Sequence, residues 1–201
     1  MRTVGVVNYK GGTSKTTTAA YLAHTWAASG ASVLLVDADP QGSSLRWSEQ
    51  APSFVPTIGL AVRDVHKRLP GIAGDRYDAV VIDTPPLEQE TGVVQSVLRA
   101  ADQVVVPMAP TMIEVDRLPP VWRAIEDVES LRDGPLDAAV LLTRVVHNAS
   151  STEAVRGLVV TSGHRVLAAT VPRLERYALA FGDVVPGDDA AYGAVATELW
   201  P

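Results

Sequence analysis

Apolar residues in this chain gather in short runs that are rich in valine, isoleucine and leucine. Runs of this length and composition predict β-strands. Six strands are predicted, over residues 3–8, 32–36, 79–82, 103–107, 139–143 and 165–171. Helices are predicted to alternate with them, over residues 15–29, 59–69, 91–101, 112–130, 150–162 and 188–199.

The alternation of strands and helices predicts an α/β fold, with a mostly parallel twisted sheet flanked by helices on both faces. Continuous apolar runs suit strands that are buried on both sides, which is typical of parallel sheets. Ligands of such sheets bind beside the carboxyl ends of the strands. The chemistry is therefore expected just after Asn8, Val36 and Ile82, where the apolar runs end.

The chain has 201 residues, of which 47% are hydrophobic and 20% charged, and its formal net charge is -6. This balance predicts a single globular domain over residues 1–201. With a negative net charge, any nucleic-acid binding would come from a local basic patch. There is no cysteine, which excludes disulfides, thiol catalysis and cysteine zinc sites. We expect a cytoplasmic protein that does not enter a membrane, because the apolar runs are too short for a signal peptide or a membrane span.

The segment after the first strand has the features of a phosphate-binding loop. It reads Lys10-Gly11-Gly12-Thr13-Ser14-Lys15-Thr16-Thr17 and leads into the first predicted helix. Glycines let the backbone approach an anion, and successive N–H groups together with the helix dipole attract phosphate. Lys15 would neutralise the β- and γ-phosphates of a nucleotide, and the Thr16 hydroxyl would bind Mg²⁺. The alternative is a glycine turn followed by a threonine helix cap.

Carboxylates follow the second and third predicted strands, Asp37 and Asp39 after one and Asp83 after the other. A carboxylate at the end of a buried strand is costly unless it has a partner or a function. Asp83 has the arrangement of a Walker B aspartate, which would hold Mg²⁺ through water beside Thr16. For all three aspartates, the alternative interpretation is a turn or a helix cap.

The phosphate loop resembles the deviant Walker A motif of the ParA/MinD family, Lys-Gly-Gly-x-x-Lys-Ser/Thr, and implies the P-loop NTPase version of the α/β fold. Tyr9 and Ser14 stand where the simple P-loop pattern requires glycine. By resemblance, Lys10 is the signature lysine that reaches across a dimer interface to the partner's nucleotide. Family members usually have glycine at the position of Ser14, where a positive φ would cost serine about 1 kcal/mol. The sequence leaves the sign of that φ open.

The resemblance continues through the acidic motifs and the C-terminal half. Matching segments are Val36-Asp37-Ala38-Asp39-Pro40-Gln41-Gly42, the switch-like Thr84-Pro85-Pro86, and residues 100–107, 170–174 and 181–183. The resemblance implies that Asp39 orients the attacking water and that Asp37 lies near the Mg²⁺ shell. It also implies that Arg144, Pro172 and Arg173 lie by the adenine. The alternative for the two arginines is a solvated surface position.

The match covers nearly the whole chain and is most similar to the small ParA-type partition ATPases. It implies a Mg²⁺-dependent ATP hydrolase that binds ATP and ADP and forms a sandwich homodimer with ATP. The dimer would bind DNA without sequence preference, associate with the nucleoid, and position plasmid or chromosome cargo. A ParB-like protein or a small centromere-binding protein would stimulate hydrolysis.

A basic excess between residues 136 and 180 is a candidate for the DNA contact. This segment has five arginines and three acidic residues. The arginines are Arg144, Arg156, Arg165, Arg173 and Arg176, and the acidic residues are Asp137, Glu153 and Glu175. On one face of a dimer these arginines would contact phosphates with a steep salt dependence. The alternative is that they are dispersed over the surface.

Three other functions remain open. A membrane-associated positioning ATPase like MinD normally has a basic amphipathic C-terminal helix, whereas residues 188–201 are acidic and have no basic residue. A metabolic P-loop enzyme, such as a relative of dethiobiotin synthetase or of cobyrinate-amidating enzymes, need not have the signature lysine. A binding module that has lost turnover through Ser14 would not release phosphate.

Overall fold

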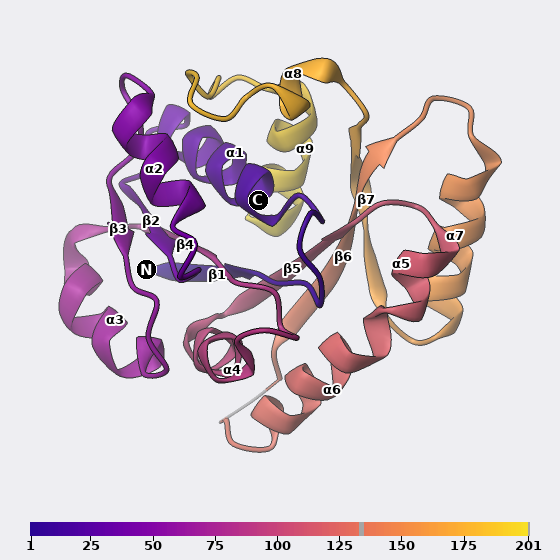
Figure 1. Ribbon diagram of the computed structural model, residues 1–201, viewed down its shortest axis with the longest axis horizontal. Helices are drawn as coiled ribbons and strands as arrows, with labels where there is room; N and C mark the ends of the chain where they lie inside the picture. The colour runs from indigo at the N-terminus through magenta and orange to yellow at the C-terminus, as the bar shows by residue number, and fades with distance from the viewer. Residues whose placement is uncertain (133–134, 201) are drawn as a thin grey trace.

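One seven-stranded sheet runs through the computed structural model, which describes residues 1–132 and 135–200 (Figure 1). Its strands lie in the order β3-β2-β4-β1-β5-β6-β7, and every pairing between them is parallel. The strands are β1 (Arg2–Val6), β2 (Val33–Asp37), β3 (Thr57–Gly59), β4 (Ala79–Asp83), β5 (Gln103–Met108), β6 (Asp137–Val145) and β7 (Arg165–Pro172). The predicted α/β fold with a parallel sheet is confirmed.

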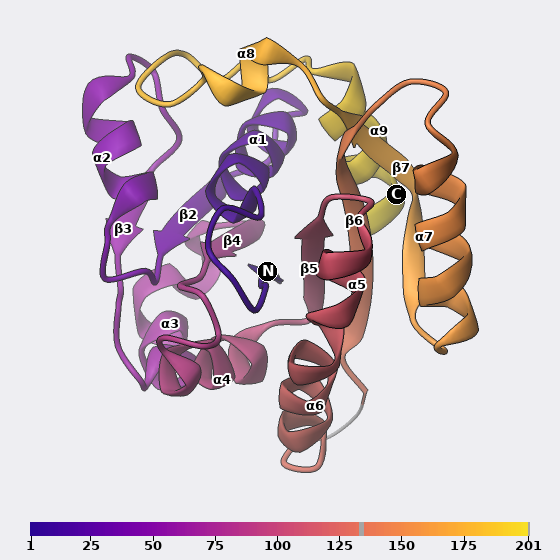
Figure 2. The same ribbon diagram turned by 45° about the vertical axis from the view of Figure 1, so that its right-hand side comes forward.

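Helices cover both faces of this sheet (Figures 1 and 2). One face carries α1 (Lys15–Ala28), α2 (Ser43–Gln50) and α9 (Ala190–Leu199), with the short α8 (Glu175–Ala178) beside them. The other face carries α3 (Val65–Ala73), α4 (Thr91–Ala100), α6 (Leu118–Glu129) and α7 (Ser150–Thr161), with α5 (Met112–Asp116) between α6 and α7. None of the described helices is both long and apolar enough to cross a bilayer.

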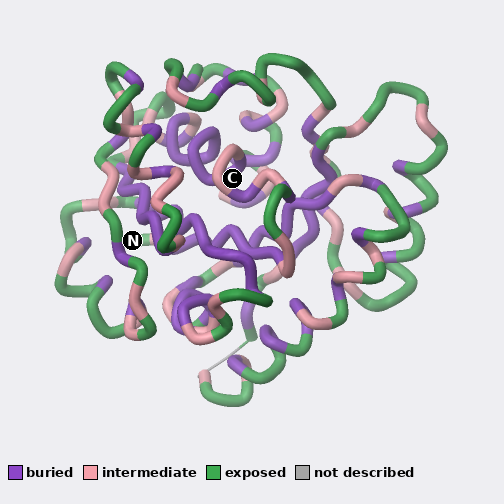
Figure 3. Tube along the Cα trace, in the orientation of Figure 1, coloured by how far each residue is buried: buried purple, intermediate pink, exposed green. Residues whose placement is uncertain are grey.

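The sheet is the buried centre of the molecule, and burial explains the composition of its strands (Figure 3). Every residue of β2 and of β4 is buried, because helices pack on both sides of them. Such strands are apolar at successive positions rather than at alternate ones. For this reason the six predicted strands are all present, with ends that differ from the prediction by one or two residues.

Strand register brings the functional motifs to one edge of the sheet. In the β1–β4 ladder Val6 lies beside Asp83, and in the β2–β4 ladder Asp37 lies beside the same residue. The carboxyl ends of the three strands are therefore level. The phosphate loop after β1 and the carboxylates of β2 and β4 meet there, as expected for a parallel sheet.

Two helix predictions are wrong in part. The predicted helix over 112–130 is divided at Arg117 into α5 and α6, because Pro119 and Pro120 lack the N–H groups that a continuous helix needs. The predicted helix over 59–69 begins only at Val65. Residues 60–64 are turns and loop, and β3 precedes them as an edge strand that pairs with β2. The sequence analysis missed this strand together with α2 and α8.

Candidate nucleotide site

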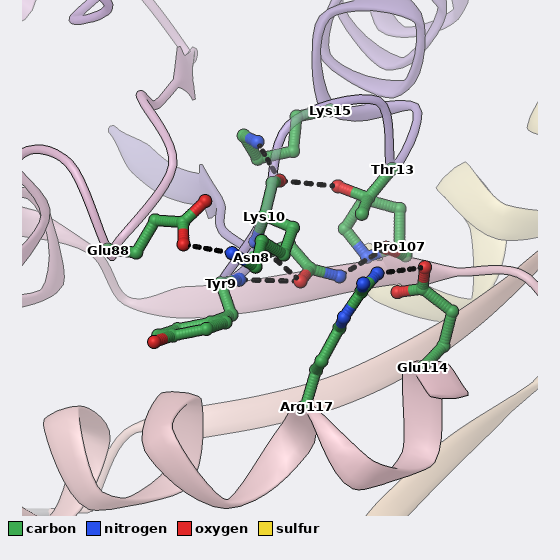
Figure 4. A network of polar contacts seen from close by, with 9 residues as sticks. All are labelled: Asn8, Tyr9, Lys10, Thr13, Lys15, Glu88, Pro107, Glu114 and Arg117. Carbon is green, nitrogen blue, oxygen red and sulfur yellow. Dashed lines mark hydrogen bonds and ion pairs between the residues drawn. The ribbon is translucent and has the colours of Figure 1, made fainter. Parts of the chain in front are cut away.

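The loop between β1 and α1 is held in shape by side chains as well as by its glycines (Figure 4). The Asn8 amide donates to the carbonyl of Pro107 over 2.7 Å, and its oxygen accepts from the Tyr9 N–H. Gly12 and Ser14 both have positive φ, 72° and 69°. The left-handed conformation costs glycine nothing but is strained for serine. The question that the sequence left open at Ser14 is thus answered, and the loop holds one strained residue.

Lys15 lies at the base of this loop and is 6% exposed. Its ammonium donates to the Lys10 carbonyl over 2.9 Å. Burial lowers the pKa of Lys15, and the nearby Asp83 and Asp39 oppose that shift. A buried ammonium on a phosphate loop gains most from a multiply charged anion, because that anion replaces the lost hydration.

Asp83 is the most strongly perturbed carboxylate of the site. It is 1% exposed, and one of its oxygens accepts from the Ser44 hydroxyl over 2.8 Å. The other oxygen is buried and has no hydrogen-bond partner among the described residues. Burial first, and the neighbouring Asp37 second, raise the pKa of Asp83 to about 7.

This environment fits a cation. A buried carboxylate oxygen without a donor is stabilised by a divalent ion, which favours the ionised form. No group of three or more histidine, cysteine or acidic residues within residues 1–132 and 135–200 is arranged to hold a metal. Thr16 and, through water, Asp83 as ligands of Mg²⁺, with phosphate and water as the others, stay a prediction.

Asp37 has both of its carboxylate oxygens occupied by backbone groups. One accepts from the Asp39 N–H over 3.0 Å and the other from the Leu45 N–H over 2.9 Å, at the start of α2. Burial raises its pKa, and these hydrogen bonds oppose that shift. The bonds fix the path of the chain from β2 to α2 and so set the position of Asp39. A place for Asp37 near the Mg²⁺ shell stays a prediction.

A cavity of about 800 Å³ opens above the phosphate loop. Most of the residues singled out in the sequence line it, namely Gly11, Gly12, Ser14, Lys15, Thr16, Thr17, Asp39, Arg144, Pro172 and Arg173. The others do not. Thr13 turns inward to donate to the Lys10 carbonyl, Asp37 and Asp83 are buried behind the loop, and the Lys10 side chain points elsewhere.

The cavity is also lined by residues that the sequence analysis missed. Tyr177 of α8 and Tyr192 of α9 lie there with Leu174. The two tyrosine rings meet edge to face, and the Tyr177 hydroxyl donates to Asp189. An apolar and aromatic wall of this kind suits a nucleobase. No sequence motif marked this wall, because α8 is four residues long and exposed. Ser44, which donates to Asp83, could have been noticed from its place after Asp39-Pro40-Gln41-Gly42.

Lys10 forms an ion pair with Glu88, a residue that the sequence analysis did not single out (Figure 4). The Lys10 side chain is 36% exposed and also lies 5.4 Å from the Tyr9 ring centre. One loop therefore holds two lysines with different orientations. Lys15 faces the cavity, whereas Lys10 faces the segment after β4.

The basic excess between residues 136 and 180 is mostly neutralised by pairing. Arg156 pairs with Glu153, Arg165 with Asp137, and Arg176 with Asp189. The two remaining arginines of the segment, Arg144 and Arg173, line the cavity. The local charge thus does not form one open basic face.

The sequence is similar to a family of nucleotide-binding domains and to several known proteins. The family described as CobQ/CobB/MinD/ParA nucleotide binding domain matches residues 4–185. The maintenance of carboxysome distribution protein A of Gloeobacter kilaueensis is 37% identical over 154 residues, which are 72% of this chain and 63% of that protein. The chromosome partitioning protein ParA of Caulobacter vibrioides is 27% identical, with 86% of this chain and 81% of that protein covered. The chain thus matches less than two thirds of the length of the Gloeobacter protein.

Two solved structures share the fold. Cobyrinic acid a,c-diamide synthase from Mycobacterium smegmatis, with a bound ATP analog and magnesium, superposes with a TM-score of 0.76 at 23% identity over 100% of this chain and 92% of that one. A plasmid partition protein from Borrelia burgdorferi bound to AMPPNP superposes with a TM-score of 0.77 at 19% identity. The superposition covers 98% of this chain and 97% of that one. Likeness at these identities concerns the fold.

Replacing Ser14 by glycine tests the backbone strain in the loop. Ser14→Gly relieves a strain of about 1–2 kcal/mol but adds roughly 0.5–1 kcal/mol of glycine entropy in the unfolded chain. In Ser150→Gly, at an exposed position of α7 with negative φ and no side-chain hydrogen bond to a described residue, only the entropy term acts. The unfolding free energy of Ser14→Gly, measured with denaturant, should therefore be roughly 1–2 kcal/mol above that of Ser150→Gly. Equal losses in both variants would mean that Ser14 is not strained.

Asp83 makes the stability of the protein without nucleotide fall as pH rises. Its pKa is about 7 when folded against 3.8 ordinarily, so between about pH 4 and 7 the folded state keeps a proton that the unfolded state loses. Asp83→Asn removes this dependence. The difference in unfolding free energy, wild type minus variant, should decline by roughly 2–4 kcal/mol across that window and then level off.

Measuring a difference removes the opposite contribution of His24. Burial lowers the pKa of His24 to about 4, so its contribution rises with pH, but it is equal in both proteins. The exposed Asp75 serves as control, and Asp75→Asn should give a flat difference. A flat difference for Asp83→Asn as well would contradict the shifted pKa.

Proposed function

Because this chain belongs to the CobQ/CobB/MinD/ParA family of nucleotide-binding domains, we propose that residues 1–201 act as one Mg²⁺-dependent ATPase domain that dimerises with ATP and positions a cargo. ATP hydrolysis is the activity of the chain. The cavity has the size of a nucleotide site, and its lining combines the phosphate loop with the aromatic Tyr177 and Tyr192. The names of its relatives, which concern carboxysome distribution and chromosome partitioning, support cargo positioning.

The loop backbone and Lys15 bind the phosphates, and the N-terminus of α1 adds its dipole to their attraction. Thr16 and Asp83 hold Mg²⁺, which when bound neutralises charge on the phosphates. Asp39, fixed through the backbone bonds of Asp37, faces the cavity and orients the attacking water. Pro172, Arg173 and Arg144, which line the same cavity as the two tyrosines, would contact the adenine.

The observation that carries the proposal is the different orientation of the two lysines. Lys15 serves the nucleotide of its own chain, whereas Lys10 is outside the lining of its own cavity and partly exposed. A lysine on a phosphate loop that does not face its own phosphates is available to a second nucleotide brought by another copy. In a sandwich dimer each Lys10 would stabilise charge on the partner's transferring phosphoryl group.

The cargo is a plasmid, a chromosome or a protein compartment, and a ParB-like or small centromere-binding partner stimulates hydrolysis to release the dimer. Differential affinity for the ATP and ADP states drives such a cycle. The helix α9 does not itself offer a membrane-binding face, because its apolar residues Val195 and Leu199 are buried in the core. They are not free to enter a bilayer.

The best surface for the phosphates of nucleoid DNA lies on the face of α3 and α4. A hollow of about 440 Å³ there is lined by His66, Arg99, Leu131 and Arg132, with Lys67 near enough to help lower the pKa of His66. Neither Lys67 nor Arg99 is in an ion pair with any residue that the structure describes. A cation without an ion-pair partner that neutralises a DNA phosphate releases the counterion condensed there, which favours binding. The paired Arg165 and Arg156 would contribute less, because they must first leave their carboxylates.

A metabolic enzyme is the second candidate, because the cobyrinic acid a,c-diamide synthase fold matches the whole chain. A small-molecule enzyme would work without a nucleotide-driven dimer and without DNA. The oligomeric state with ATP therefore separates the two candidates.

Asp39→Ala tests the switch. Losing the group that orients water should lower ATP hydrolysis by roughly 10²-fold and leave binding intact, so that the ATP-bound dimer accumulates. Light scattering after size exclusion should show monomers without nucleotide and stable dimers of the variant with ATP. Asp188→Ala, at an exposed position, should behave as wild type. If ATP leaves every variant monomeric, the metabolic candidate is favoured.

Salt dependence tests the DNA surface. Losing two phosphate contacts in Lys67→Ala with Arg99→Ala should reduce the slope of log affinity against log salt by about 2. Fluorescence anisotropy with a random duplex, in ATP and in the Asp39→Ala background, measures this slope. Arg165→Ala removes a paired charge and should change it little. If Arg165→Ala had the larger effect, the DNA surface would belong to residues 136–180.

A further inference from the structure

Glu88 stands out as the residue that holds Lys10, and its side chain makes no other hydrogen bond or ion pair with a described residue. In Figure 4 its carboxylate is directed at the Lys10 ammonium from the segment after β4. The pair joins residues 78 positions apart in the sequence. It is partly exposed, with 36% of the lysine and 24% of the glutamate side chain accessible.

The backbone places Glu88 at this point. The Leu87 N–H donates to the Asn8 carbonyl over 3.1 Å, and the Glu88 N–H donates to the Tyr9 carbonyl over 3.3 Å. The segment after β4 therefore runs along the phosphate loop and is bonded to it just before Lys10. These two bonds hold the Glu88 backbone beside the loop, within reach of the Lys10 ammonium.

The same segment begins at the proposed nucleotide site. Pro86 and Gln89 line the cavity, and Thr84 next to Asp83 donates its hydroxyl to the Val6 carbonyl over 2.8 Å. Glu88 thus lies between two residues that face the nucleotide, while its own carboxylate faces Lys10. A shift of residues 84–89 on contact with the γ-phosphate would move Glu88 relative to Lys10.

We infer that Glu88 is a positioning residue that holds Lys10 in its own subunit and thereby opposes dimerisation until the pair is broken. This inference rests on the proposed function, since it requires that Lys10 acts on the nucleotide of a second copy. Each Lys10 must leave Glu88 before it reaches the partner. Every dimer therefore breaks two such pairs.

The size of the effect follows from the exposure of the pair. A partly exposed ion pair changes an equilibrium about 1.4- to 5-fold, so breaking two pairs should weaken the dimer roughly 2- to 30-fold. Neutralising Glu88 should remove this penalty. Salt screens exposed charges, so the penalty should also shrink as ionic strength rises.

The test measures the dimer dissociation constant with ATP by sedimentation in the hydrolysis-deficient Asp39→Ala background. Adding Glu88→Gln should tighten the dimer roughly 2- to 30-fold at low salt, and the gain should fall toward onefold in 0.5 M salt. Glu88→Asp keeps the charge and should stay near the parent. Glu90→Gln, two residues away and in no ion pair with a described residue, should leave the constant unchanged.

The outcomes separate the inference from the function beneath it. A tighter Glu88→Gln dimer whose advantage falls with salt supports the inference. If the parent dimerises with ATP but Glu88→Gln matches it at low salt, the inference fails and the proposed function stands. An advantage shared by Glu90→Gln would show a general charge effect and also overturn the inference. If no variant dimerises with ATP, the proposed function fails and the inference falls with it.

Discussion

Burial of charge at the carboxyl ends of three parallel strands is the constraint on which the rest of the site depends. The sheet excludes water from Asp83 and Asp37, so each carboxylate needs donors or a cation. Asp37 obtains two backbone donors and in return fixes the turn into α2. Asp83 has only Ser44 for one oxygen and none for the other in the described residues. The buried ammonium of Lys15 lies close enough for the charge of Asp83 to raise the lysine pKa against the effect of burial.

This arrangement is poised for a ligand with both signs of charge. A nucleotide with Mg²⁺ gives the ammonium an anion and the carboxylate a cation at the same time, which explains why such groups tolerate burial together. Lys10 does not take part in this charge compensation, because it pairs with Glu88, a partly exposed residue of the segment after β4. In the proposed function, the interior of the site binds the nucleotide, and the Lys10–Glu88 pair at its rim links that site to a second copy.

The sequence was informative where burial is continuous. The runs 33–36 and 79–82 are apolar at every position and 4–7 at all but Gly5, so β2, β4 and β1 and the motifs after them could be placed within two residues. β3 and α2 were missed because they are short and only partly buried at the sheet edge. The division of the helix at Arg117 could have been foreseen, since two prolines follow closely.

Other features of the site depend on contacts between distant residues. The sign of φ at Ser14 is decided by the packed loop, and the ion pair of Lys10 joins segments on different strands. The arginines of residues 136–180 looked like a basic excess because acids such as Asp189, outside the segment, could not be assigned to them. Composition counts charges, but the fold decides which of them are neutralised.

The central claim is that Lys10 acts on the nucleotide of another copy, and mixing two inactive variants tests it most directly. Lys10→Ala chains keep Asp39, and Asp39→Ala chains keep Lys10. A mixed dimer would contain one complete site, formed from both copies, so an equal mixture should recover about a quarter of the wild-type ATPase rate if the chains pair at random. If each variant alone and their mixture are all inactive at the same level, Lys10 serves its own nucleotide, and the account of a trans-acting lysine is wrong.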